Sequence, residues 1–387
     1  MSFSEEIEKL DWENVRSTIA GVTARDVERS LQTERRTFRD VLSLLSPAAE
    51  SYLESMAQIA HNITVRRFGR IIQMYAPIYV SSECTNSCVY CGFNRHNAIE
   101  RATLTLDEAA REGEILHREG FRHVLLVSGE SPRHASVDYL CAVAERLRPL
   151  FASISIEVYP LDTDEYRALI ASGVDGLTIY QETYHKGRYA EVHPAGRKRN
   201  YKWRLDTTDR GGEAGFRRLN IGALLGLSDW RIEGAYMAFH AAYLTRRFWK
   251  SQISVSFPRL RPAAGGYEPE FPVSDPQMVQ LMCALRLFLP DAGLVLSTRE
   301  SRELRDNLVP LGVTQMSAGS KTAPGGYASK PEAEGQFEVS DKRSPGEVAH
   351  MIASRGYEPV WKDWDAAFLT GGEAGSALDV RRASVER

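Results

Sequence analysis

Short apolar, β-branched runs alternate with helical patterns over most of the chain. Eight runs are predicted to be strands, at residues 74–80, 123–128, 153–159, 176–180, 220–225, 253–257, 294–297 and 313–317. Each but the last is followed by a helical pattern, at residues 106–119, 137–147, 164–172, 200–214, 229–244, 276–287 and 301–307. Such alternation predicts a parallel sheet. Eight units over roughly 250 residues match a closed TIM-type (β/α)8 barrel, with an open, doubly wound sheet as the alternative.

The segments on either side of the barrel have different patterns. Residues 1–70 are helical in pattern, with Thr23 and Asp26 placed as a capping box and Ser46-Pro47 opening a long helix. A loop rich in Gly, Pro, Lys and Glu follows the last strand, then a short helix at 345–355 and a small, charged tail at 371–387. We therefore expect a helical N-terminal extension (1–70), the barrel (71–320) and a C-terminal extension (321–387).

The composition is that of a soluble globular protein. The 387 residues are 43% hydrophobic and 26% charged, and 48 basic against 51 acidic residues give a net charge of -3. This balance provides no long-range field for nucleic acid or a membrane surface. No apolar run is long enough to span a membrane, and the acidic start is unlike a signal peptide. Five cysteines, an odd number, favour a reducing, cytoplasmic location.

Three of the cysteines lie together directly after the first predicted strand. Cys84, Cys88 and Cys91 have the spacing C-x3-C-x2-C, so their thiolates can reach one metal centre. Thiolates select zinc, copper(I) or an iron–sulfur cluster. A zinc site would use His96 as a fourth ligand, whereas a cubane with three protein ligands leaves one iron open to a small molecule. The remaining cysteines, Cys141 and Cys283, have the surroundings of buried small hydrophobes.

The motif resembles the signature of radical S-adenosylmethionine (SAM) enzymes, with Tyr90 as the aromatic residue before the third cysteine. The resemblance implies a 4Fe-4S cluster on the three cysteines and SAM as the second cofactor. Further stretches are similar to the aromatic amino acid lyases of that superfamily, namely residues 70–79, 156–160, 180–185, 257–262 and 317–322. The lyase that matures hydrogenase carries a second three-cysteine cluster in a C-terminal domain. No cysteine follows Cys283 here, which favours the branch that serves thiazole biosynthesis.

This resemblance implies cleavage of the Cα–Cβ bond of L-tyrosine to dehydroglycine and p-cresol, with methionine and 5′-deoxyadenosine formed from SAM. The alternative enzymes act on tryptophan, or on tyrosine in another pathway such as hydrogenase cofactor maturation. A non-catalytic iron–sulfur or zinc scaffold is the alternative from another class. The implied partners are an electron donor such as flavodoxin or ferredoxin and a thiazole synthase that takes up the dehydroglycine.

The resemblance also assigns residues to the two cofactors. Ser128, Gly129 and Glu130, at the end of the second predicted strand, are expected to hold the methionyl amine. Glu157 is expected to bind the ribose hydroxyls, and Glu182 is expected to bind the same ligand or to form an ion pair. Arg204 is expected to bind the methionyl carboxylate bidentately, with Arg210 as a competitor. The cofactor-binding residues are thus Tyr90, Phe93, Ser128, Gly129, Glu130, Glu157, Glu182 and Arg204.

A second group is expected to face the amino acid substrate. Arg299 ends the seventh predicted strand, and a lone arginine at a barrel mouth needs a carboxylate partner. Tyr79, Ser317 and Ser320 also lie at strand ends and are expected to border the substrate. Arg259 and Arg261 are rival carboxylate binders, with a structural role in a stiff loop as the alternative.

Overall fold

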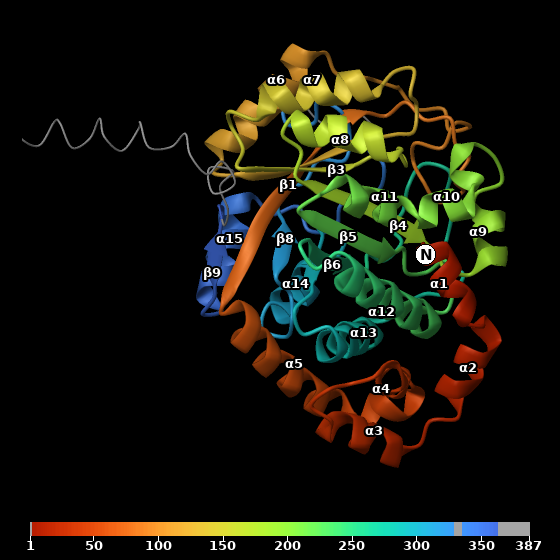
Figure 1. Ribbon diagram of the computed structural model, residues 1–387. Helices are drawn as coiled ribbons and strands as arrows, with labels where there is room; N and C mark the ends of the chain where they lie inside the picture. The colour runs from red at the N-terminus through yellow and green to blue at the C-terminus, as the bar shows by residue number, and fades with distance from the viewer. Residues whose placement is uncertain (1, 329–334, 363–387) are drawn as a thin grey trace, which may run out of the picture.

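The fold is a closed barrel of eight parallel strands in a computed structural model that describes residues 2–328 and 335–362 (Figure 1). Each strand pairs with the next, and β1 pairs with both β2 and β8, which closes the ring. The predicted barrel is confirmed, and the open sheet is wrong. The strands are β1 (Ile71–Ser81), β2 (His123–Ser128), β3 (Ser153–Glu157), β4 (Gly176–Glu182), β5 (Arg218–Ala223), β6 (Gln252–Ser256), β7 (Gly293–Leu296) and β8 (Gln315–Ser317).

Helices surround the barrel, and all but one of those predicted between strands form as single helices. They are α6 (Leu106–Arg118), α7 (Val137–Leu147), α8 (Thr163–Ala171), α12 (Trp230–Arg247), α13 (Asp275–Phe288) and α14 (Arg302–Leu308). The single helix predicted at 200–214 is wrong. That part of the chain forms α10 (Tyr201–Leu205) and α11 (Thr207–Ala214), which meet at Asp206. The Asp206 carboxylate accepts hydrogen bonds from the backbone and hydroxyl of Ser4, each at 2.7 Å, so this position serves the N-terminal segment.

The N-terminal helices run from the right side of Figure 1, where α1 contacts α10, to its bottom, where α4 and α5 contact α13. They are α1 (Phe3–Glu6), α2 (Trp12–Ala20), α3 (Ala24–Gln32), α4 (Phe38–Leu44) and α5 (Leu53–Phe68), with a 3-10 turn at Pro47–Tyr52 before α5. The predicted capping box of Thr23 and Asp26 opens α3. Twelve of the 18 residues of α12 are buried, because this helix is covered on both its barrel side and its outer side.

The C-terminal segment returns to the first strand. α15 (Pro345–Ser354) matches the predicted closing helix, and β9 (Glu358–Val360), which the sequence did not predict, pairs with the start of β1. The predicted tail at 371–387 lies outside the described residues. Among the helices of the described residues, none has the length and apolar character needed to cross a bilayer.

Two strands shift register at their C-terminal ends. The pairing of β1 with β2 shifts between Tyr79 and Ser81, and that of β4 with β5 shifts between Tyr180 and Glu182. Such bulges redirect the side chains that follow them and are frequent beside active sites. The bulge in β1 directly precedes the cysteine loop. The bulge in β4 changes the direction of the Glu182 side chain.

Candidate active site

The three cysteines of the motif open into one cavity at the C-terminal end of the barrel. Cys84, Cys88 and Cys91 lie in the loop after β1, and all three are free thiols that line the same cavity. Burial raises the pKa of Cys88 to about 12. A metal that binds here would therefore displace a tightly held proton from this thiol.

A side-chain amide fixes the middle of the cysteine loop. Asn86 donates from Nδ2 to the Glu130 carboxylate at 2.6 Å, and its Oδ1 accepts from the backbone N–H of Lys198 at 3.0 Å. The backbone carbonyl of Glu130 accepts from the N–H of Thr85 at 2.9 Å. Glu130 thus holds the loop from two sides, and its carboxylate is already used by the protein.

Within the described ranges, 2–328 and 335–362, no group of three or more His, Cys, Asp and Glu side chains is arranged to hold a metal ion as it stands. His96, the fourth ligand of the zinc alternative, is exposed to solvent. The fit of an iron–sulfur cluster and SAM is therefore judged from the cavity wall and its donor atoms.

The turn after β2 contacts the cysteine loop closely. A Cβ atom on Gly129 would lie 2.3 Å from the Glu83 carbonyl oxygen, so only glycine fits here. Beside it, the buried hydroxyl of Ser128 has no hydrogen-bond partner among the described residues. A buried polar atom without a partner is costly, and a ligand with a polar group in this cavity would satisfy it.

Two carboxylates from neighbouring strands face the same cavity. Glu157, at the end of β3, has a pKa raised to about 7, because burial and the negative charge of Glu182 outweigh the pull of Arg299 and other cations. Burial also acts to raise the pKa of Glu182, but the charges of Lys198 and Arg204 hold that pKa below its usual value. The two carboxyl groups therefore differ in pKa. Glu182 is ionised at neutral pH, whereas Glu157 is close to the midpoint of its titration.

Glu182 sits at the centre of an ion-pair cluster. Its Oε1 accepts from Lys198 Nζ at 2.6 Å and from Arg204 Nη2 at 3.2 Å. Its φ of 71° is the sole positive φ of a non-glycine residue in the described part of the chain. Strained backbone of this kind tends to occur at functional sites. Arg204 also donates from Nε to the Tyr180 carbonyl at 2.7 Å, whereas its competitor Arg210 lies over the Trp203 ring.

The aromatic residues of the motif are fixed by a hydrogen bond at Tyr90 and by ring packing at Phe93. The Tyr90 hydroxyl bonds His193 Nε2 at 2.7 Å, and burial lowers the pKa of His193 to about 2, so this imidazole is neutral and accepts the bond. Phe93 packs edge-on against Tyr79, with ring centroids 5.9 Å apart. Tyr90 is buried against Cys88, and Phe93 lines the cavity.

Arg299 lies at the substrate side without a carboxylate partner among the described residues. Its guanidinium instead stacks on the Phe337 ring, 3.3 Å from the ring centroid. Its charge nevertheless acts to lower the pKa of Glu157 and Tyr79, so it lies near these two groups. The buried hydroxyl of Ser320 also has no partner in the described residues.

The other substrate-side residues are already engaged. Ser317 Oγ accepts from the Thr298 N–H at 3.1 Å. Arg259 pairs with Glu300 and with Asp275, the latter at 2.7 Å, and Arg261 pairs with Glu300 at 3.0 Å. The two rival arginines thus have a carboxylate of the protein itself, which leaves Arg299 as the free guanidinium of the three.

Sequence reasoning missed several residues of the cavity wall, among them the polar residues Lys198 and Gln336. Lys198 lies in the run Arg197–Arg199, which has the pattern of a solvated basic turn, yet only its neighbours point outward. Gln336 lies in the loop after β8, where no periodicity gave a signal. Gly196, two residues before Lys198, permits the close approach to the cysteine loop, because a Cβ atom there would lie 2.2 Å from Asn86 Oδ1.

Fold and cysteine motif together define the class. Residues 78–238 match the model of the radical SAM superfamily, and residues 256–358 match the Biotin and Thiamin Synthesis associated domain. The protein is a radical SAM enzyme, and membership in this superfamily implies SAM and an iron–sulfur cluster.

Similarity to individual proteins narrows the assignment. The chain is 46% identical to 2-iminoacetate synthase of Escherichia coli K12 over 94% of its own length and 97% of that protein, and 44% identical to the Salmonella typhimurium protein of the same name over the same shares. The crystal structure of the FeFe-hydrogenase maturase HydG from Carboxydothermus hydrogenoformans is 31% identical, with a TM-score of 0.80 over 93% of this chain and 82% of that one. The chain belongs to the 2-iminoacetate synthase family.

Proposed function

We propose that this protein is a lyase that cleaves the Cα–Cβ bond of L-tyrosine to 2-iminoacetate (dehydroglycine) and p-cresol, for the thiazole of thiamine. The observation that carries the proposal is a single cavity that unites Cys84, Cys88 and Cys91 with Glu157 and the Glu182 ion-pair cluster. The 46% identity to 2-iminoacetate synthase over nearly the whole chain supports the same activity.

The cysteines are proposed to hold a 4Fe-4S cluster, since three soft thiolates leave one iron open to SAM. When bound, the cluster supplies the electron that cleaves SAM into methionine and a 5′-deoxyadenosyl radical. Glu157 is proposed to accept the ribose hydroxyls, and the free hydroxyl of Ser128 and the backbone of Gly129 to border the methionyl amine. Tyr90 and Phe93 keep water from the reacting atoms.

Arg204 is proposed to bind the methionyl carboxylate through the bidentate contact that the sequence predicted. Its Nε and Nη2 already serve Tyr180 and Glu182. Each of these bonds takes one N–H, so both N–H groups of Nη1 and the second N–H of Nη2 are left for a carboxylate. Lys198 and Glu182 would then act by holding Arg204 in place.

The tyrosine carboxylate is proposed to bind Arg299, whose charge no carboxylate of the described residues neutralises. Ser320 supplies a free hydroxyl and Tyr79 an aromatic wall, while Ser317 acts through its bond to Thr298. Once the hydrogen atom of the substrate amine had passed to the 5′-deoxyadenosyl group, rupture of Cα–Cβ would give dehydroglycine. The 4-hydroxybenzyl fragment takes up one electron and one proton to become p-cresol.

The partners are proposed from the chemistry. Reduction of the cluster needs an electron donor such as flavodoxin or ferredoxin, and a reducing cytoplasm would keep the three thiols free. Dehydroglycine hydrolyses in water, so direct uptake by a thiazole synthase is proposed as well.

The test is anaerobic turnover of the reconstituted protein. With reductant and SAM, deoxyadenosine and p-cresol are expected from tyrosine and neither p-cresol nor an indole fragment from tryptophan. The Cys88→Ala protein should form no deoxyadenosine, whereas Cys141→Ala should match the wild type. Fully loaded protein that produces no deoxyadenosine with any aromatic amino acid would overturn the proposal, and a tryptophan-derived fragment would favour the alternative substrate.

A further inference from the structure

Residues 335–343, which we call the C-terminal strap, cross the mouth of the barrel and are fixed there by backbone hydrogen bonds to three different loops. These bonds join the N–H of Gln336 to the Thr322 carbonyl at 2.9 Å, that of Glu338 to Pro262 at 2.8 Å, and those of Ser340 and Asp341 to Thr298 at 3.0 and 3.1 Å. The strap therefore has a defined position although it contains no helix or strand.

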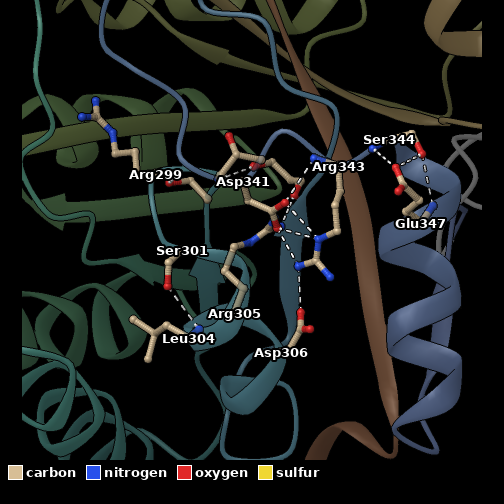
Figure 2. A network of polar contacts seen from close by, with 12 residues as sticks. Arg299, Ser301, Leu304, Arg305, Asp306, Asp341, Arg343, Ser344 and Glu347 are labelled. Atoms are coloured by element: carbon tan, nitrogen blue, oxygen red, sulfur yellow. Dashed lines mark hydrogen bonds and ion pairs between the residues drawn. The ribbon is translucent and has the colours of Figure 1, made fainter.

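A buried charge network anchors the far end of the strap (Figure 2). Arg305 donates to the Asp341 carboxylate and to the Ser317 carbonyl, and the Arg305 and Asp341 side chains are 0% and 1% exposed. Arg343 bonds the same carboxylate at 2.7 Å and reaches Asp306 at 2.7 Å. The strap is thereby joined to β8 through Ser317 and to α14 through Arg305 and Asp306. This anchor limits the movement of the whole strap, including its first residues next to the cysteine loop.

The near end of the strap places Gln336 against the cysteine loop. Its backbone carbonyl accepts from the Gly92 N–H at 3.0 Å. Its side-chain Oε1 accepts from the Tyr79 hydroxyl at 2.8 Å, and its Nε2 is directed at the sulfur of Cys91 at 3.8 Å. One carboxamide therefore joins a residue on the substrate side to a sulfur of the proposed cluster.

We propose that Gln336 is a positioning residue that donates a hydrogen bond to the Cys91 thiolate and so raises the reduction potential of the cluster, with Tyr79 fixing the orientation of its amide. The inference rests on the proposed cluster in the cysteine loop. Hydrogen bonds to the sulfurs are one of the main determinants of the potential of such clusters. A donor stabilises the reduced state more, because that state carries more negative charge.

The direction of the effect follows from this difference. Loss of the donor should make the cluster harder to reduce and move its midpoint potential to a more negative value. Gln336→Met keeps the size of the side chain and removes both the donor and the acceptor. Gln336→Glu keeps the shape and adds negative charge, so it should move the potential further in the same direction.

The experiment is a redox titration of reconstituted holoenzyme followed by electron paramagnetic resonance, with iron and sulfide content measured on every sample. Gln336→Met and Gln336→Glu are compared with wild type and with Ser340→Ala, which alters an exposed side chain of the same strap. Tyr79→Phe should give a smaller negative shift, and Tyr79→Phe combined with Gln336→Met no more than Gln336→Met alone.

The outcomes separate this inference from the proposed function. A wild-type protein that binds no iron–sulfur cluster would overturn both. A fully loaded Gln336→Met protein with the wild-type potential, or with a shift to less negative values, would overturn the role of Gln336 alone. If Gln336→Met folds poorly, Gln336→Glu decides the matter by the same potential.

Discussion

Lys198 and Glu182 form an ion pair with an N–O distance of 2.6 Å in which both side chains are largely withdrawn from solvent. Lys198→Met would leave Glu182 with Arg204 as its remaining cation. Loss of one partner of a buried pair is costly, and we expect a loss of about 3 kcal/mol in the free energy of unfolding, the lower end of the usual range, because Arg204 stays. Urea unfolding of the cluster-free protein measures this loss in the free energy of unfolding.

A matched exposed pair serves as the control for this prediction. Lys186 and Glu8 are 2.7 Å apart with both side chains about half exposed, so Lys186→Met should change the unfolding free energy by less than about 1 kcal/mol. Adding Glu182→Gln to Lys198→Met should not recover the loss, because the buried Arg204 would then have lost its carboxylate partner. Equal effects of the two lysine substitutions would contradict a special role of the buried pair.

Glu157 makes the stability depend on pH in the opposite direction from an ordinary surface carboxylate. Its pKa is raised from 4.5 to about 7 by burial, so its contribution is fully present below pH 4.5 and is lost as the pH rises through 7. Glu157→Gln should therefore be more stable than wild type at pH 8, by up to about 3 kcal/mol, and equal to it at pH 4. Urea unfolding at the two pH values checks this, and parallel pH profiles would refute it.

The same carboxyl group should make cofactor binding depend on pH. An ionised Glu157 accepts hydrogen bonds from ribose hydroxyls better than a protonated one. The affinity of the loaded wild-type protein for SAM should therefore rise between pH 6 and 8, and that of Glu157→Gln should be weaker and flat. Anaerobic calorimetry with SAM measures both; a wild-type affinity independent of pH would speak against this contact.

Arg299 and Arg261 provide a paired test of substrate recognition. Arg299→Lys loses the planar fork and the stacking on Phe337, so the KM for tyrosine should rise roughly 10- to 100-fold while SAM binding is unchanged. Arg261→Lys should stay within about twofold of wild type, because Arg261 pairs with Glu300. If Arg261→Lys had the larger effect on KM, the substrate carboxylate would have to be assigned to Arg261 instead of Arg299.

Asp341 is expected to be the most sensitive position of the strap network. Asp341→Asn leaves the fully buried Arg305 without its counter-charge, at a cost of about 3–5 kcal/mol in the free energy of unfolding. Asp306, at the more exposed end of the network, is the control, and Asp306→Asn should cost about 1 kcal/mol or less. Thermal and urea unfolding compare the two variants. Similar losses for Asp341→Asn and Asp306→Asn would contradict the conclusion that the buried Asp341 is the main anchor of the strap.

The barrel was predictable because each strand is a short β-branched run followed by a helical pattern. β9 was not, because a three-residue strand with Pro359 in its middle has no detectable alternation. The break at Asp206 also escaped prediction. Its side chain makes no capping hydrogen bond, and its partner Ser4 is 202 positions away in the sequence.

The site was predictable where a residue type had a local reason to be there. The cysteine spacing is such a reason, and so is the position of Glu157 at the end of a strand. Lys198 and Gln336 have none, since their roles depend on loops that the barrel brings together. The strained backbone of Glu182 was equally invisible, because φ depends on the bulge in β4 and the ion pairs around it.

The first strand of the barrel has a consequence for folding during synthesis. β1 pairs with β8 and β9 as well as β2, so its partners extend to Val360. A ribosome adding about 5–20 residues per second has long since made the cysteine loop when those partners emerge. The nascent chain therefore carries three uncovered thiols for many seconds, and cellular oxygen or free metal ions have that interval in which to react with them.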